Sequence, residues 1–405
     1  MDAVTRLIDE FTSRYGSAPT VLVRAPGRVN LIGGHTDYSR LPVMPMAIDR
    51  AVYVALGDGP AGVEVDSARF PDPIHLELRG NRAELEGWHR YVAAAMDTIG
   101  YVGGARVLVD SDLPPTGGFA SSTAVTIGML SALGISAGDP PLREELPELA
   151  LVAERSIGVE GGAMDQTIIA LAEEGSALKI DFMPSVTTEV PIPEDVAVVV
   201  AYSGTPAPKG DEATKLHKSR IVAARAAAAM LAHGSGRDAG SPPVLAAVRD
   251  VDETDALPEQ ASAAEVATAI GEEVDQLVVM AASTFDPTAP LPIRSVARHI
   301  LAEARRVDAA ESALRAGTMS RFGTILDASH ASLREFGASS DGLDAVTAAM
   351  REAGAWGARL TGTGLGGFAV AVCSPDLVGD VTVAAEAATG GPAFRVEASS
   401  GVSGM

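Results

Sequence analysis

Apolar side chains follow two different spacings along the first part of the chain, which indicates that helices and strands are mixed. Residues 3–15 repeat apolar positions at the spacing of one helix face, so we expect an amphipathic helix there. In residues 19–33, apolar and β-branched runs flank the pair Pro26-Gly27. Because proline and glycine favour turns, this pattern predicts two strands joined at that pair.

Helical patterns dominate farther along the chain. Helices are predicted over residues 88–99 and 123–133, and an Ala-rich helix over 213–232. The Gly-, Ser- and Pro-containing stretch 233–243 is the best candidate for a linker. Residues 294–353 are again mainly helical. Strands and helices without a regular βαβα order predict an α+β fold.

Composition and charge narrow the class of protein. The chain has 405 residues, enough for two or three domains, and 47% of them are hydrophobic, enough for a full core. Its net charge of −22 argues against a nucleic-acid partner and against an anionic membrane surface. Cys373 is the only cysteine, so no intramolecular disulfide can form. Together with an N-terminus that does not resemble a signal peptide, this favours the cytoplasm.

The segment 113–130 indicates an anion site. Gly117 and Gly118 follow a predicted strand, and Ser121 and Ser122 stand where a helix should begin. A helix N-terminus presents free N–H groups to an anion, and serine hydroxyls there can also bind Mg²⁺. An ordinary serine N-cap is the alternative interpretation.

A second glycine-rich loop, residues 360–372, comes directly before a strand. A dinucleotide-binding fingerprint needs the reverse order, with the loop between a strand and a helix, so a Rossmann site is rejected. The chain also contains no Gly-Lys dipeptide and therefore no P-loop motif. A tight turn would explain one such loop, whereas two favour a nucleotide site of a different design.

A third segment, residues 153–166, supplies two carboxylates, Glu154 and Asp165. Gly161 and Gly162 allow the backbone to turn just before Asp165. A carboxylate placed this way can orient or deprotonate an attacking hydroxyl, while Glu154 can hold Mg²⁺. Solvent-exposed surface is the alternative for either residue.

Taken in order, these segments resemble the GHMP small-molecule kinases, and most closely the galactokinase branch. The motifs that carry the resemblance are GRVNLIGGHTDY (27–38), LPPTGGFASSTA (113–124), the segment 153–166, and RLTGTGLGG (359–367). Residues 88–92, 321–335 and 341–362 also resemble galactokinases. The resemblance spans nearly the whole chain and is weakest from about residue 200 to 290.

The resemblance implies a GHMP kinase fold. The N-terminal domain, residues 1–195, would be α+β and like the second domain of ribosomal protein S5, and the C-terminal domain, residues 196–405, would be ferredoxin-like. The implied reaction transfers the γ-phosphoryl group of ATP to a sugar hydroxyl at the anomeric carbon, with Mg²⁺ as cofactor. Sugar and ATP would be its partners, with no protein partner, nucleic acid or membrane implied.

The resemblance also implies roles for individual residues. Asp165 matches the catalytic aspartate of the family, and Arg28 matches the arginine that pairs with it. The sugar-binding residues implied are Gly34, His35, Asp37, Gly162 and Asp165. The ATP-binding residues implied are Pro115, Gly117, Gly118, Ala120, Ser121, Ser122 and Gly364. Ser122 and Glu154 are implied as ligands of Mg²⁺.

The chain departs from the galactokinase pattern at Gly34, where galactokinases read GEHTDY. The missing carboxylate belongs to the side of the family's sugar pocket that meets the C6 hydroxymethyl group. Gly34 is therefore expected to make space and to remove a negative charge, which would change the choice of sugar. Neutral drift, with water in the gap, is the alternative.

The segment 205–220 differs as well, because it lacks the tyrosine with which galactokinases contact the sugar. Lys209, Lys215, His217 and Lys218 make the segment locally basic. These side chains either contact an anionic substituent on a longer sugar or form a solvated helix face. A milder departure lies in the phosphate loop, where Thr116 and Ala120 replace the usual glycine and serine and are expected to tune ATP binding.

The departures at Gly34 and in residues 205–220 both fall where galactokinases bind sugar. They predict an ATP-dependent sugar 1-kinase for a galactose relative that is extended or modified at C6, such as a higher-carbon sugar. An ordinary galactokinase that tolerates Gly34 is the first alternative. A galactokinase-like sensor without catalysis is the second, although Arg28, Asp165, Glu154 and Ser122 argue against it.

Overall fold

The structure, a computed structural model, describes residues 3–70, 72–80, 82, 84–115, 117–159, 161–208, 211–251, 253–278 and 285–405, without the side chains of 211–213. The departures predicted at Thr116 and Lys209 lie outside these residues. The predicted N-terminal helix is confirmed as α1 (Ala3–Tyr15), with Leu7 and Phe11 buried on one face.

The first sheet is antiparallel and is built mainly from the N-terminal part of the chain. It contains β1 (Val21–Ile32), β2 (Met44–Ser67), β3 (Ile74–Leu76), β4 (Gly104–Ser111) and β11 (Ser403–Gly404). The long β2 pairs with β1, β3 and β4, and β11 adds to the free side of β1.

The prediction of two strands around Pro26-Gly27 was wrong, because β1 continues through this pair as one strand. The pairing of β1 with β2 shifts register between Pro26 and Arg28. An irregularity of this kind bends a strand and re-aims the following side chain without ending the strand. Here the backbone N–H of Arg28 donates to the carbonyl of Phe119, 3.1 Å away, instead of to the sheet partner.

Helices cover both faces of this sheet because residues of β2 alternate in direction. Val52 and Val54 face a core shared with α2 (His89–Ile99), α3 (Ser121–Ala137), α4 (Leu146–Ser156) and α5 (Met164–Leu171). Ala51 and Tyr53 face α1 instead. The helix predicted over residues 88–99 is confirmed as α2, which ends at Gly100, a C-cap residue with a positive φ of 66°.

A second antiparallel sheet has the order β10-β7-β9-β8. Its strands are β7 (Ala197–Tyr202), β8 (Gly357–Thr361), β9 (Phe368–Cys373) and β10 (Ala393–Val396), while β5 (Ser176–Phe182) and β6 (Ser185–Pro191) form a separate hairpin. Val198 and Val372 on one face join the core of the first sheet, and Val199 and Ala371 on the other face pack under helices. The two sheets therefore share one continuous core.

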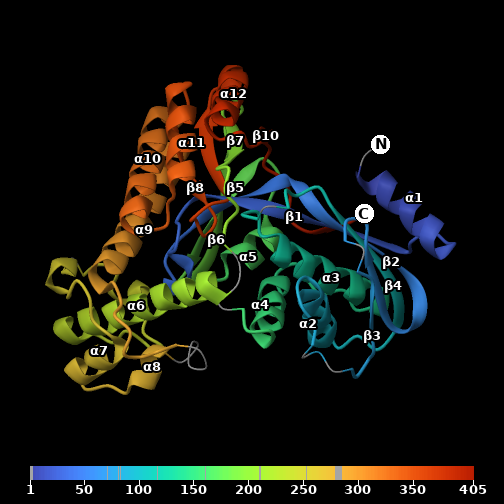
Figure 1. The fold of residues 1–405 in the computed structure, drawn as a ribbon, viewed down its shortest axis with the longest axis horizontal. Helices are drawn as coiled ribbons and strands as arrows, with labels where there is room; N and C mark the ends of the chain where they lie inside the picture. The colour runs from blue at the N-terminus through green and yellow to red at the C-terminus, as the bar shows by residue number, and fades with distance from the viewer. Residues whose placement is uncertain are drawn as a thin grey trace.

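The remaining helices gather on the side of the molecule away from the first sheet (Figure 1). They are α6 (Asp211–Ser235), α7 (Ala263–Ile270), α8 (Val274–Val278), α9 (Ile293–Arg315), α10 (Met319–Glu335), α11 (Asp341–Glu352) and α12 (Val378–Thr389). The helical prediction for 294–353 is confirmed. The predicted linker 233–243 is shorter than expected, because α6 continues to Ser235.

The expected domain boundary between residues 195 and 196 falls between β6 and β7 and stays a prediction. The C-terminal tail crosses back over it, since Ala398 bridges to Ile48 and β11 pairs with β1. Among the described residues, no helix has both the length and the apolar character needed to cross a membrane. Contacts of Arg28 with Asp165 and Gly118, and of Gly362 with Gly118, bring the segments 27–38, 113–124, 153–166 and 359–367 together in one region.

Candidate active site

An arginine–carboxylate fork lies at the centre of this region. Arg28, re-aimed by the irregularity in β1, donates from Nε and Nη2 to the two carboxylate oxygens of Asp165, each at 2.7 Å. Its third nitrogen, Nη1, donates to the carbonyl of Gly118 at 2.6 Å. Asp165 stands in the first turn of α5 and remains 25% exposed. The fork therefore fixes a partly accessible carboxylate beside the glycine loop 117–118.

Asp37 lies beside this fork, at the start of the short 3-10 helix η1 (Asp37–Ser39). Its carboxylate packs so closely on Gly162 that a Cβ at that position would overlap it. Burial and the nearby charge of Asp165 raise the pKa of Asp37 to about 6. The structure thus brings together three of the residues expected to bind sugar, Asp37, Gly162 and Asp165.

The predicted phosphate loop meets the third motif. Gly117 and Gly118 have φ values of 88° and 100°, a region that glycine adopts without strain. They lead to the N-terminus of α3 at Ser121, and a Cβ on Gly362 would lie 3.5 Å from the Cα of Gly118. Ala120, at the N-cap, has φ of 56° and provides no side-chain cap. The free N–H groups of the first turn of α3 are therefore available to an anion.

Gly364 and Pro115 were also expected to bind ATP, but their surroundings differ from those of Gly118 and Gly362. Gly364 packs on the carbonyl of Ala338, where a Cβ would overlap backbone, and Pro115 is exposed. Their predicted roles in ATP binding therefore rest on the motif alone.

Glu154, at the end of α4, fits the Mg²⁺ site expected of it. Its side chain is buried, and the amide Nε2 of Gln166 donates to Oε2 at 2.6 Å. Oε1 makes no hydrogen bond to any part of the chain that the structure describes. Burial, with the charge of Asp165 adding to it, raises the pKa of Glu154 to about 7. A buried carboxylate oxygen without a partner suits a cation, which Ser122 at the start of α3 could also approach.

The described residues contain no group of three or more His, Cys, Asp or Glu side chains that could hold a metal ion. Any Mg²⁺ bound by Ser122 and Glu154 would therefore need further ligands from phosphate or water, as Mg²⁺ commonly uses.

The expectation that Gly34 opens space was wrong. The backbone of Gly34 is buried, and a Cβ added to it would lie 2.6 Å from Nη2 of Arg359 and 3.4 Å from Leu333. The guanidinium of Arg359, whose side chain is fully buried in β8, fills the volume that a larger residue would need. Gly34 therefore makes room for a cation of the protein itself.

Two residues of α9 hold the same segment and were not identified from the sequence. Glu303 accepts the backbone N–H groups of Gly33 and Gly34 at 3.1 and 3.3 Å, and the hydroxyl of Ser329 at 2.5 Å. His299 lies with Nε2 2.9 Å from the carbonyl of Gly34. Only the spacing of His299 and Glu303, one helical turn apart, could have indicated that they share a face.

The basic segment expected to contact sugar reaches the site in part. His217, in α6, lies with its ring 6.3 Å from that of His35 and 5.6 Å from that of Tyr38. Lys215 is exposed and Lys218 is half-buried. Burial, with the nearby charge of Arg220, lowers the pKa of His35 well below its ordinary value, so His35 is neutral at pH 7.

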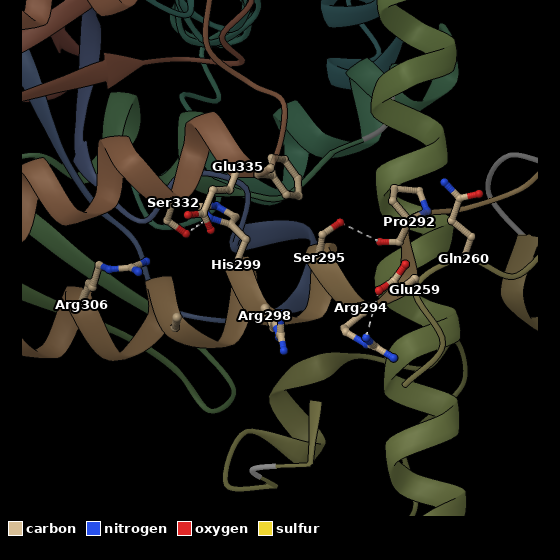
Figure 2. Close-up of a pocket in the computed structure, with 12 residues that line it drawn as sticks. Glu259, Gln260, Pro292, Arg294, Ser295, Arg298, His299, Arg306, Ser332 and Glu335 are labelled. Atoms are coloured by element: carbon tan, nitrogen blue, oxygen red, sulfur yellow. Dashed lines mark hydrogen bonds and ion pairs between the residues drawn. The ribbon is translucent and has the colours of Figure 1, made fainter. Parts of the chain in front are cut away.

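A cavity of about 470 Å³ lies beside α9, and Figure 2 shows the side chains around it. His299, Phe336 and Arg306 form part of its wall. The ring of Phe336 lies 4.5 Å from that of His299 and 4.9 Å from that of His35. Arg28, Asp165, Gly34 and His35 are not among its lining residues.

The chain resembles known proteins in sequence and in structure. The chain matches the galactokinase galactose-binding signature over residues 9–58, the GHMP kinases N terminal domain over 89–173, and the GHMP kinases C terminal domain over 310–388. It is 35% identical over 378 residues to the galactokinase of Roseiflexus sp. (strain RS-1), covering 90% of this chain and 86% of that protein. It is 33% identical to the galactokinase of Chloroflexus aurantiacus, covering 95% and 92%.

Solved structures agree. The crystal structure of Lactococcus lactis galactokinase complexed with galactose matches with a TM-score of 0.80 and 25% identity, over 99% of this chain and 100% of that one. A mevalonate kinase matches with a TM-score of 0.63 and 14% identity, over 93% and 99%, which shows a shared fold alone.

Proposed function

We propose that this chain, which belongs to the galactokinase family of the GHMP kinases, phosphorylates a monosaccharide at its anomeric C1 hydroxyl with ATP. The observation that carries the proposal is the fork between Arg28 and Asp165 next to the loop 117–118 and the N-terminus of α3. It combines a fixed carboxylate, a fixed cation and a site for phosphates, which are the parts that phosphoryl transfer needs.

Asp165 would accept a hydrogen bond from the C1 hydroxyl and take its proton as that oxygen forms a bond to the γ-phosphorus. The bond between the γ-phosphorus and the bridging oxygen breaks, and ADP leaves with the electron pair. Arg28 keeps Asp165 in place through two hydrogen bonds and adds positive charge beside the transferring group. Asp37 would orient the sugar through its ring hydroxyls.

The backbone from Gly117 to Ser122 would bind the phosphates of ATP, and Ser122 and Glu154 would hold Mg²⁺. When bound, Mg²⁺ neutralises charge on the phosphates. Oε1 of Glu154 is buried and has no hydrogen-bond partner among the described residues by distance, and the Thr123 side chain lies beside this carboxylate. The ionised carboxylate of Glu154 is the form that would bind such a cation.

The sugar we propose is a galactose relative with a modification at the end opposite C1. The absence of a tyrosine from residues 205–220 supports this proposal, whereas Gly34 does not, because Arg359 fills the volume beside it. An ordinary galactokinase is the alternative, supported by the relatives' name and by the Lactococcus lactis structure with galactose.

Turnover of ATP with purified protein, Mg²⁺ and galactose-type sugars tests the reaction. We expect sugar-dependent formation of ADP and a sugar 1-phosphate, and a loss of roughly 10²- to 10⁴-fold in Asp165→Asn, with ATP binding unchanged. Asp181→Asn is the matched control, since Asp181 is an ion-paired carboxylate of β5 that contacts Lys179. Equal turnover in wild type and Asp165→Asn would reject the assignment, and absent turnover in wild type would favour a sensor.

A further inference from the structure

Gln166 is a buried amide that the surrounding chain uses at only one of its two ends. It follows Asp165 in α5, and its side chain is 4% exposed. Its Nε2 donates to Oε2 of Glu154 at 2.6 Å, whereas its carbonyl oxygen, Oε1, has no hydrogen-bond partner among the described residues. A buried acceptor without a partner costs free energy, so protein stability alone does not explain an amide at this position.

Glu154 shows the same shortage of donors. Its side chain is equally buried, and its Oε1 also has no hydrogen-bond partner by distance in the part of the chain that the structure describes. The side chain of Thr123, in α3, lies beside this carboxylate. The Glu154–Gln166 pair therefore contains two buried acceptor oxygens without partners. A hydrated Mg²⁺ ion supplies what such oxygens favour, because it offers positive charge and the hydrogens of its bound water.

The contact with Gln166 limits how the carboxylate of Glu154 can turn. The last torsion of a glutamate side chain is soft, so a strong donor on Oε2 restricts the direction of Oε1. The opposite orientation of the amide would set two acceptor oxygens against each other, so ionised Glu154 keeps Nε2 toward itself. Hydrogen bonds to ligating side chains commonly orient those ligands toward a metal ion. One turn of α5 thus carries both Asp165 and the amide that holds Glu154.

We propose that Gln166 is a positioning residue for the cation: it holds Glu154 so that Oε1 is left to Mg²⁺, and its own carbonyl accepts a hydrogen bond from a water molecule on that ion. The inference rests on the proposed function, in which Glu154 and Ser122 hold Mg²⁺, and adds Gln166 to that site. Because Gln166 acts through Glu154, its loss should weaken the contribution of Mg²⁺ and leave sugar binding unchanged.

Calorimetry with a non-hydrolysable ATP analogue measures this contribution without turnover. The ratio of the affinities with excess Mg²⁺ and with EDTA reports how much the ion adds to binding. Gln166→Met has a similar volume and lacks both polar ends. We expect it to lower the ratio by about 10-fold or more, with the affinity in EDTA as in wild type. An unchanged ratio, or a wild type in which Mg²⁺ adds no affinity, would overturn the inference.

Two controls separate positioning from general damage to α5. Thr167→Val removes a hydrogen bond from the next residue, a buried threonine that donates to the carbonyl of Ala163 at 2.7 Å, and should keep the wild-type ratio. Gln166→Met in a Glu154→Gln background should change the ratio by less than about 2-fold, because the residue it acts through is already lost. Equal losses in both backgrounds, or in Thr167→Val and Gln166→Met, would overturn the inference. Gln166→Asn, whose amide is on a shorter side chain, gives the same test if the methionine variant does not fold.

Steady-state kinetics with Mg²⁺, ATP and galactose-type sugars keep the inference separate from the proposed function. Gln166→Met should lower kcat/KM for ATP by about 10-fold or more and leave KM for the sugar unchanged, whereas an equal loss for ATP and sugar would contradict the inference. A lower Mg²⁺ ratio in Gln166→Met without sugar phosphorylation by wild type would reject the proposed reaction and keep the inference. Phosphorylation by wild type with an unchanged ratio in the variant would do the reverse.

Discussion

Replacing Glu303 by glutamine should reveal how strongly the sugar-binding segment depends on one buried charge. The Glu303 side chain is fully buried in α9 and stands between Arg306 and Arg359. Burial alone would raise the pKa of Glu303, but Arg359, followed by other nearby cations and the hydroxyl of Ser329, holds it below its ordinary value. Glu303 is therefore ionised at neutral pH, and glutamine removes its charge while keeping its volume.

The magnitude follows from what glutamine leaves behind. Only one end of an amide accepts hydrogen bonds, whereas both oxygens of Glu303 accept them, from Gly33, Gly34 and Ser329 on one side and from Arg306 on the other. One set of donors becomes unsatisfied, and Arg359 loses its countercharge. Breaking a buried pair on one side costs about 3–5 kcal/mol, a large part of the roughly 5–15 kcal/mol that stabilises a typical domain.

Urea unfolding followed by circular dichroism measures this loss, with the free energy of unfolding extrapolated to water. A second variant, Arg359→Met, and the double variant with both substitutions complete a double-mutant cycle. We expect the double variant to be less destabilised than the sum of the single variants, by about 1–3 kcal/mol, because it leaves no uncompensated charge. Glu259→Gln, an 85% exposed carboxylate beside Arg294, is the control and should not change stability. A cycle that is additive within about 0.5 kcal/mol would refute the reasoning.

Two other predictions concern the site itself. Gly162→Ala should lower kcat/KM for the sugar by up to about 100-fold, since its Cβ would displace the Asp37 carboxylate. Gly161→Ala, with open space around it, is the control and should behave as wild type. Equal kcat/KM values for the two variants in steady-state kinetics would contradict this prediction. The free energy of unfolding without Mg²⁺ should fall as pH rises from about 4.5 to about 7. Folding raises the pKa of Glu154 from 4.5 to about 7, so in this range the folded protein keeps a proton that the unfolded chain has released. Thermal unfolding of Glu154→Gln across this range should show a weaker pH dependence, and an unchanged dependence would count against the assignment to Glu154.

The helices and the site motifs could be predicted because their signals are local. Apolar spacing and a glycine cap defined α1 and α2, and the motif around Asp165 matched a family pattern. The wrong prediction of a turn at Pro26-Gly27 came from the same kind of local signal. Proline and glycine signal a turn in general, but here the pairing of β1 with β2 absorbs them as a register shift. Tertiary pairing overrode the turn preference, and that override is what aims Arg28.

The sequence by itself determined the α+β class, the negative net charge, the family resemblance and the residue types available for phosphoryl transfer. These depend on composition, short-range periodicity and motifs, which a linear chain displays. The tertiary structure alone decided what surrounds Gly34. Arg359 lies 325 positions away along the chain and Glu303 lies 269 away, so no local pattern shows that both meet that glycine. Whether a missing side chain leaves a gap or a place for another residue depends on packing between distant segments, and here packing places a buried cation beside Gly34.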